Sequence, residues 1–166
     1  VEVAARVRRE ERVGEDLGMQ RRYPLPILLV NAARATALLG RARIALLRIG
    51  PKDVVELNRL STAAARRGAG RPVELEECDK TAFFISRMAT RVPWRADCLV
   101  QALAGRRWLE KEGISSRISV GAARGPDGSL EAHAWLLCQD RVVLGGDVTR
   151  FNVLLDPDTT PVERTP

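Results

Sequence analysis

The sequence predicts an α+β fold, in which a helical N-terminal half is followed by one further helix and a small antiparallel sheet. Three observations support this prediction. Apolar residues recur at helical spacing before residue 91. A well-delimited helical segment follows at residues 97–112, and beyond Gly113 the apolar residues alternate as they do in strands. With 166 residues, 45% of them apolar, the chain can bury a core without disulfides or metals.

The first half of the chain predicts three helices. The segment from Pro26 to Gly50 carries apolar residues at helical spacing and ends at a Gly-Pro pair. Asp53 to Arg67 predicts a second helix, and residues 68–72 predict a loop because they combine glycine with proline. Glu74 to Thr90 predicts a third helix, with acidic residues in its first turn where the helix dipole favours them.

The second half begins with the clearest helix, from Asp97 to Glu112. Asp97 suits the N-cap, and Gly113 suits the C-terminal stop. Its predicted buried stripe consists of small residues and one leucine, namely Cys98, Ala102, Gly105 and Leu109. Three strands follow, with tight turns between them: Arg117 to Ala122, Leu130 to Cys138 and Arg141 to Leu144.

The predicted organisation is a charged N-terminal lead at 1–20, a helical region at 21–90, a core at 91–155 and a loose tail at 156–166. We expect the folded domain to begin near Met19. The longest apolar stretch, Leu25 to Val30, is far short of the ~20 residues that a membrane span requires. The charged N-terminus does not predict a signal peptide.

Cysteine and histidine usage excludes several classes of site. The three cysteines, Cys78, Cys98 and Cys138, form no C-x-x-C motif, so we expect free thiols in a reducing cytoplasm. The single histidine, His133, excludes a metal site built on several histidines. We therefore expect neither a metal nor another cofactor.

The charge of the chain is unevenly distributed. Residues 1–96 carry 19 Lys and Arg against 11 Asp and Glu, whereas residues 97–166 carry 8 against 10. Solvated helix faces explain this basicity most simply, and a docking surface for an acidic partner or for nucleic acid is the alternative. Because no aromatic residues are interleaved with the arginines, we expect no nucleic-acid partner.

Three residues together predict a nucleophilic site. Cys98 begins a helix, whose N-terminal N–H groups stabilise a thiolate. His133 lies in the second predicted strand and can take the proton of the Cys98 thiol. Asp147 follows the adjacent strand and can orient the imidazole, because a tight turn near Gln139 brings residue 133 opposite residue 146 or 147. That register favours Asp147 over Asp140, which falls in the turn itself.

Each of these residues also has a structural interpretation. A cysteine in an alanine-rich helix is often a small buried apolar residue, which is what we expect of Cys78 and Cys138. A histidine on a strand is often part of the core or the edge, and an aspartate after two glycines is often a turn residue. Trp135 points to the same side of its strand as His133 and can wall a cleft.

Two segments, Pro93 to Ala104 and Glu131 to Trp135, resemble the transglutaminase-like leader peptidases of lasso-peptide biosynthesis, the microcin-processing type. The resemblance covers roughly residues 24–150 and is most specific at 93–147. It implies a papain- or transglutaminase-like cysteine peptidase core at 91–155. Cys98 would be the nucleophile, His133 the general base and acid, and Asp147 the orienting carboxylate. Trp94 and Trp135 would contact substrate.

The same resemblance implies a function and partners. Such enzymes cut the leader from a ribosomally made precursor peptide, and an ATP-dependent macrolactam cyclase acts next. Residues 21–90 lack the short strands of a fused leader-recognition domain, so the chain resembles the split type, which requires a separate recognition protein. Two alternatives remain open: a transglutaminase-like amidase or peptidase outside lasso biosynthesis, and a non-catalytic binding module.

Overall fold

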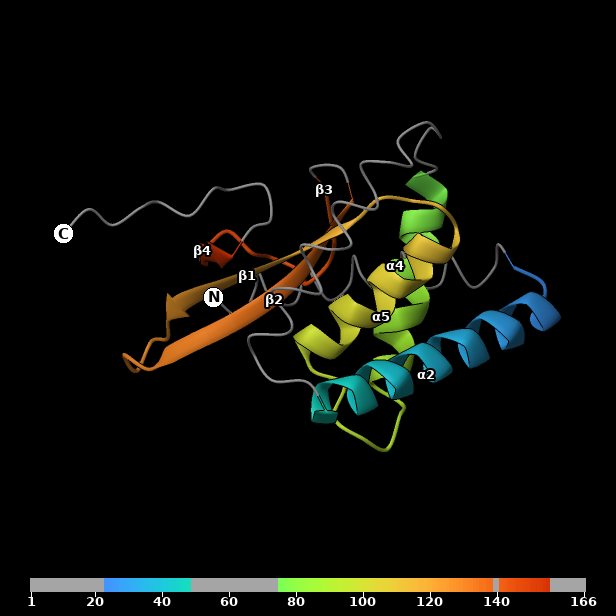
Figure 1. The fold of residues 1–166 in the computed structure, drawn as a ribbon, viewed down its shortest axis with the longest axis horizontal. Coiled ribbons are helices and arrows are strands. Elements are labelled where there is room, and N and C mark those ends of the chain that lie inside the picture. Colours follow the sequence, from blue (N-terminus) through green and yellow to red (C-terminus); the bar gives the residue numbers. More distant parts are fainter. Residues whose placement is uncertain (1–22, 49–74, 139–140, 156–166) are drawn as a thin grey trace, which may run out of the picture.

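The computed structural model describes residues 23–48, 75–138 and 141–155. Three helices and four strands lie in these ranges (Figure 1). The helices are α2 (Leu25–Arg48), α4 (Leu75–Ala89) and α5 (Cys98–Lys111). The strands are β1 (Arg117–Arg124), β2 (Leu130–Cys138), β3 (Arg141–Leu144) and β4 (Asn152–Leu155). The fold is α+β, as the sequence predicts.

The four strands form one antiparallel sheet in the order β3-β2-β1-β4. The predicted bounds of β2 and β3 are confirmed, while β1 extends two residues beyond the predicted Ala122. Strand β4 was not predicted from the sequence. It pairs with β1 on the side away from β2, so the first strand after the helices lies inside the sheet rather than at its edge.

Helices α4 and α5 pack on one face of this sheet, and α2 packs on these two helices. The core that they share with it includes Ile118 of β1, Leu136 of β2 and Leu144 of β3. Gly105 of α5 sits where helix and sheet come closest, because a Cβ at this position would lie 2.4 Å from Leu144 Cδ1 and 2.9 Å from Leu136 Cδ2. Gly105, a member of the small-residue stripe predicted for this helix, therefore lies at the contact with β2 and β3.

Trp108 of α5 joins the three helices. Its side chain is fully buried, and its ring stacks on Phe84 of α4 with 6.2 Å between the ring centroids. Its indole Nε1 donates to Glu77 of α4 at 2.9 Å, which satisfies the one polar atom of the ring. From α2, the guanidinium of Arg34 lies 4.2 Å from the ring centroid and pairs with Glu112 at 2.6 Å.

The ends of α5 explain how this helix is delimited. Asp97 occupies the N-cap in an extended conformation, as predicted, but its side chain makes no capping hydrogen bond. At the other end Gly113 has a φ of +73°, and the N–H of Ile114 donates to the carbonyl of Leu109 at 2.9 Å. This is a Schellman motif, in which a left-handed glycine ends the helix.

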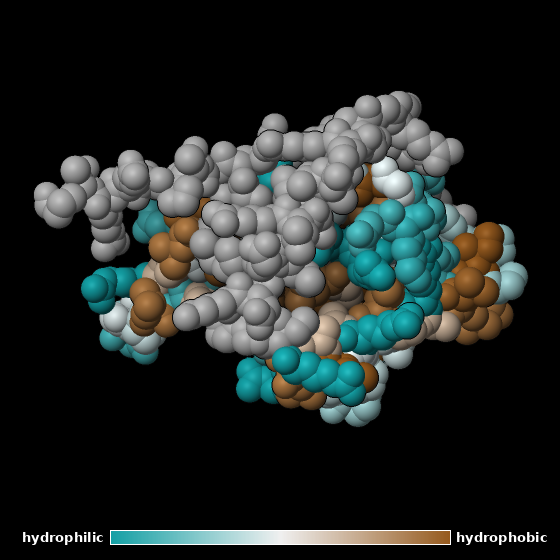
Figure 2. All heavy atoms as spheres, in the orientation of Figure 1, coloured by the Kyte–Doolittle hydropathy of each residue, from teal (hydrophilic) through white to brown (hydrophobic). Residues whose placement is uncertain are grey.

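The other helix predictions are confirmed within two residues for α2 and α4. The helix predicted at Asp53 to Arg67, the lead at 1–20 and the tail at 156–166 lie outside the described residues. Within the described ranges, no helix combines the length and apolar character needed to cross a membrane. Figure 2 shows apolar side chains on the surface, and the exposed ones include Leu25, Leu29 and Val30 at the start of α2.

Candidate functional site

Cys98 is the first residue of α5, at the end where the helix presents N–H groups that have no partner within the helix. Its side chain is partly buried and packs against the core. Cys78 and Cys138, by contrast, are buried. Of the three thiols, Cys98 thus has both the exposure and the backbone surroundings that a nucleophile needs.

His133 lies on β2, a strand that contacts α5. Because side chains alternate along a strand, His133 and Trp135 project from the opposite face to Ala134 and Leu136, which contribute to the helix-facing core. The ring of His133 is half-buried. In the part of the chain that the structure describes, no hydrogen bond links Cys98, His133 and Asp147 to one another. The structure therefore does not bring the two side chains together: Cys98 packs against the helix-facing core, whereas the His133 ring lies on the other face of the sheet against Trp135 and Phe151.

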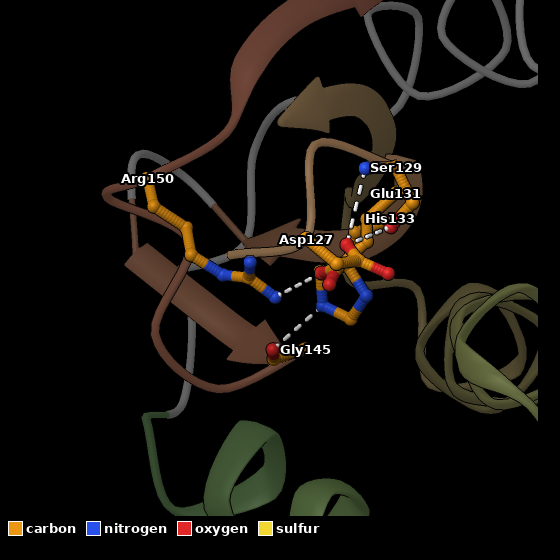
Figure 3. Close-up of polar contacts among 6 residues, drawn as sticks. All are labelled: Asp127, Ser129, Glu131, His133, Gly145 and Arg150. Atoms are coloured by element: carbon orange, nitrogen blue, oxygen red, sulfur yellow. Dashed lines mark hydrogen bonds and ion pairs between the residues drawn. The ribbon is translucent and has the colours of Figure 1, made fainter. Parts of the chain in front are cut away.

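The imidazole of His133 bonds to the main chain instead. Its Nε2 lies 2.8 Å from the carbonyl oxygen of Gly145 (Figure 3). A carbonyl oxygen only accepts hydrogen bonds, so Nε2 is the donor and carries a proton. In the neutral ring the unprotonated, basic nitrogen is consequently Nδ1, which is the nitrogen that could accept a proton from a thiol.

Two aromatic rings hold the imidazole. Phe151 stacks on it, with 4.9 Å between centroids and 27° between planes, and Trp135 lies 6.2 Å away at the same angle. Trp135 points to the same side as His133, as predicted, but only 4% of it is exposed. Trp135 is therefore a buried side chain that packs beside the imidazole and helps to hold it in place. Phe151 was not identified from the sequence, because its position depends on the turn that precedes it.

Asp147 lies three residues beyond the end of β3. The ladder between β2 and β3 ends at the pair Leu136 and Leu144, since Gly145 and Gly146 adopt φ values of +122° and +67° and turn the chain away. The expected pairing of His133 with residue 146 or 147 is therefore not formed. Oδ1 of Asp147 accepts hydrogen bonds from Thr149 N at 3.1 Å and Thr149 Oγ1 at 2.7 Å. Asp140 lies outside the described residues.

Trp94 lies against α2. Its ring is the nearest neighbour of the Cβ position at Gly40, at 3.5 Å. The indole Nε1 is buried and has no hydrogen-bond partner among the residues described. Its contact with substrate stays a prediction, and what the structure adds is a packing role between α2 and the segment that leads to Cys98.

An ion pair and a cation–π contact lie beside His133. Arg150 pairs with Glu131 of β2 at 2.5 Å (Figure 3). Its guanidinium also lies 4.4 Å from the ring centroid of Phe151. Since Phe151 stacks on His133, these contacts connect the start of β2 to the segment between β3 and β4 across the histidine. Both partners are substantially exposed, so we expect the ion pair itself to contribute little to stability.

Cys78 and Cys138 lie side by side, although 60 residues separate them in the sequence. The hydrogen bond between their thiols and their burial raise the pKa of Cys78 well above its ordinary range. Cys138 in turn donates from Sγ to the carbonyl of Ser115 at 3.5 Å. The spacing of the cysteines in the sequence, which contains no C-x-x-C motif, does not predict this pair.

Among the described residues no cluster of His, Cys, Asp or Glu could hold a metal ion.

A helix that begins with a partly buried cysteine and packs on an antiparallel sheet carrying a histidine defines an α+β core of the transglutaminase-like class. The comparison with known families agrees: residues 37–156 match the model of the transglutaminase-like superfamily. Because this match covers more than two thirds of the chain, the protein belongs to that superfamily, which includes cysteine proteases. No curated protein and no solved structure matches the chain.

Proposed function

We propose that this protein is a cysteine peptidase that removes the leader from a lasso-peptide precursor, with Cys98 as nucleophile and His133 as general base and acid. The observation that carries the proposal is the placement of Cys98 at the start of α5, a helix that packs on the strand bearing His133. The superfamily match adds support, because the superfamily includes cysteine proteases.

The proposed reaction is acyl transfer in two steps. When substrate binding brings the two side chains together, the Cys98 thiol gives its proton to Nδ1 of His133, and the sulfur attacks the scissile carbonyl carbon. The resulting oxyanion collapses to a thioester as the imidazolium protonates the leaving amine, which is the new N-terminus of the core peptide. Water, deprotonated by His133, then hydrolyses the thioester and releases the leader with a free carboxylate.

The proposal includes a separate leader-recognition protein. Large apolar side chains at the start of α2 are exposed, among them Leu25, Leu29 and Val30, and such surfaces mark interaction sites. Arginines on the same helix, such as Arg41, would complement an acidic partner. The double substitution Leu29→Gln and Val30→Gln should therefore weaken stimulation by the partner while leaving the fold intact.

Cleavage of a precursor peptide, followed by mass spectrometry with and without recognition protein, tests the function. We expect leader removal that depends on the partner and falls to background in Cys98→Ala and in His133→Ala. Ser86→Ala, on the exposed face of α4, is the matched control and should cleave normally. Efficient cleavage of unrelated peptides without a partner would favour the amidase or peptidase outside lasso biosynthesis. Binding without cleavage would favour the non-catalytic module.

A further inference from the structure

The acceptor that orients His133 is contributed by the backbone. The 2.8 Å contact between Nε2 and the Gly145 carbonyl fixes which nitrogen carries the proton and where the ring lies. In nucleophilic triads this task falls to a group that accepts from the ring nitrogen remote from the nucleophile. A main-chain carbonyl can perform it, since it accepts the same hydrogen bond as a carboxylate but carries no net charge.

Gly145 is held in place by close packing. With a φ of +122°, its backbone adopts a conformation that side chains disfavour. A Cβ would also lie 2.4 Å from Cβ of Trp135 and 3.1 Å from its Cα. The carbonyl thus reaches His133 because the glycine backbone lies directly on the neighbouring tryptophan. Gly146 offers a contrast, since its φ is +67° but no atom lies within 4 Å of its Cβ position.

Asp147 has a different local function. Its Oδ1 accepts two hydrogen bonds from Thr149, an arrangement that stabilises a turn. The same turn continues with a hydrogen bond from Phe151 N to the Val148 carbonyl at 3.0 Å. Asp147 therefore stabilises the conformation of the segment that places Phe151 against the His133 ring.

We propose that the main-chain carbonyl of Gly145, rather than the carboxylate of Asp147, orients His133, and that Asp147 is a positioning residue acting through the Thr149 turn. The catalytic meaning of this assignment rests on the proposed function, because it presumes that His133 is the general base. The orientation itself does not, and it can be measured without substrate.

The single histidine of the chain makes nuclear magnetic resonance the direct test. Long-range ¹H–¹⁵N correlation spectra of the full chain distinguish the two neutral tautomers of His133. We expect the Nε2–H form in the parent protein and in Asp147→Asn, whose amide oxygen can still accept from Thr149.

Gly145→Ala and Gly146→Ala form the matched pair. Both place alanine at a positive φ, but only Gly145→Ala also forces Cβ into Trp135. We expect Gly145→Ala to produce a mixture of tautomers and Gly146→Ala to retain Nε2–H. If Gly145→Ala does not fold, the Asp147→Asn spectra still decide the question.

The proposal would be overturned by an Asp147→Asn variant that loses the Nε2–H tautomer. In cleavage assays, Asp147→Asn should stay within about tenfold of the parent, whereas loss of an orienting carboxylate costs about 10⁴-fold. If instead the proposed function is wrong, the cleavage assay would show that His133→Ala retains activity, while the spectra of the parent protein would still show the Nε2–H tautomer.

Discussion

The ring of Phe151 stacks on the ring of His133, with 4.9 Å between their centroids and 27° between their planes. The two residues come from different parts of the sheet. His133 lies within β2, and Phe151 precedes β4, which is separated from β2 by β1. The contact therefore depends on the turn after β3, and it ties the position of the imidazole to the conformation of residues 145–151.

Replacement of Phe151 by leucine should reduce catalysis more than stability. Leucine fills much of the volume, but it cannot stack on the imidazole, a contribution of about 0.5–1.5 kcal/mol in aromatic pairs. We expect kcat/KM for precursor cleavage to fall about tenfold, with little change in thermal unfolding. Val153→Leu, at a largely exposed position on β4, serves as the control. Equal activity of the parent and Phe151→Leu would show that the stack does not position His133.

The contact between α5 and the sheet predicts a contrast between two helical glycines. Gly105→Ala should lower the free energy of unfolding by about 1–3 kcal/mol, because its Cβ would overlap the side chains of Leu136 and Leu144. Gly40→Ala in α2 should be neutral or stabilising by up to about 1 kcal/mol, because its Cβ would meet Trp94 at an ordinary contact distance. Urea unfolding of both variants measures the difference, and equal stability of the two would contradict this packing.

The turn between β1 and β2 predicts a pH dependence. Hydrogen bonds from Ser129 Oγ at 2.6 Å and Ser129 N at 3.1 Å lower the pKa of Asp127. The folded state thus holds this carboxylate's proton less tightly than the unfolded chain does. The resulting stabilisation is complete above the unfolded pKa of about 3.9 and is lost as the pH falls through the lower folded value.

Urea midpoints of the parent and of Asp127→Ala check this sign. The variant should be less stable near neutral pH, and the gap should narrow as the pH falls below about 4. Ser129→Ala, which keeps the main-chain N–H, should show a smaller effect of the same sign. A gap that widens in acid would contradict the hydrogen-bonding assignment.

Much of the fold follows from local sequence signals. Apolar spacing located α2 and α4, Gly113 marked the end of α5, and tight turns bounded β2 and β3. Strand β4 was not predicted, because Asn152–Leu155 is only four residues long and follows a turn-forming segment. The bulge between Leu136 and Leu137 and the two left-handed glycines also changed the expected register beyond Leu144.

The site was predictable only in part. Cys98 and His133 carry recognisable side-chain chemistry, so helix and strand context made them candidates, and their catalytic roles stay predictions. The acceptor at Gly145 is a main-chain carbonyl, which every residue possesses, and nothing in the residue type indicates its role. The Cys78–Cys138 pair arises from long-range packing, with one thiol on α4 and the other at the end of β2, and sequence spacing does not encode it.

The most direct test of the central claim, that Cys98 and His133 work as a pair, is the alkylation of the three cysteines by iodoacetamide near neutral pH. Peptide mass mapping would resolve each thiol in the parent, in His133→Ala and in the Ser86→Ala control. Cys98 should react fastest, because Cys78 and Cys138 are buried whereas Cys98 is only partly buried. Loss of the imidazole should slow Cys98 by about tenfold or more while the control stays unchanged. The account would be contradicted if Cys98 were alkylated as slowly as the other two thiols, or if its alkylation rate did not change in His133→Ala.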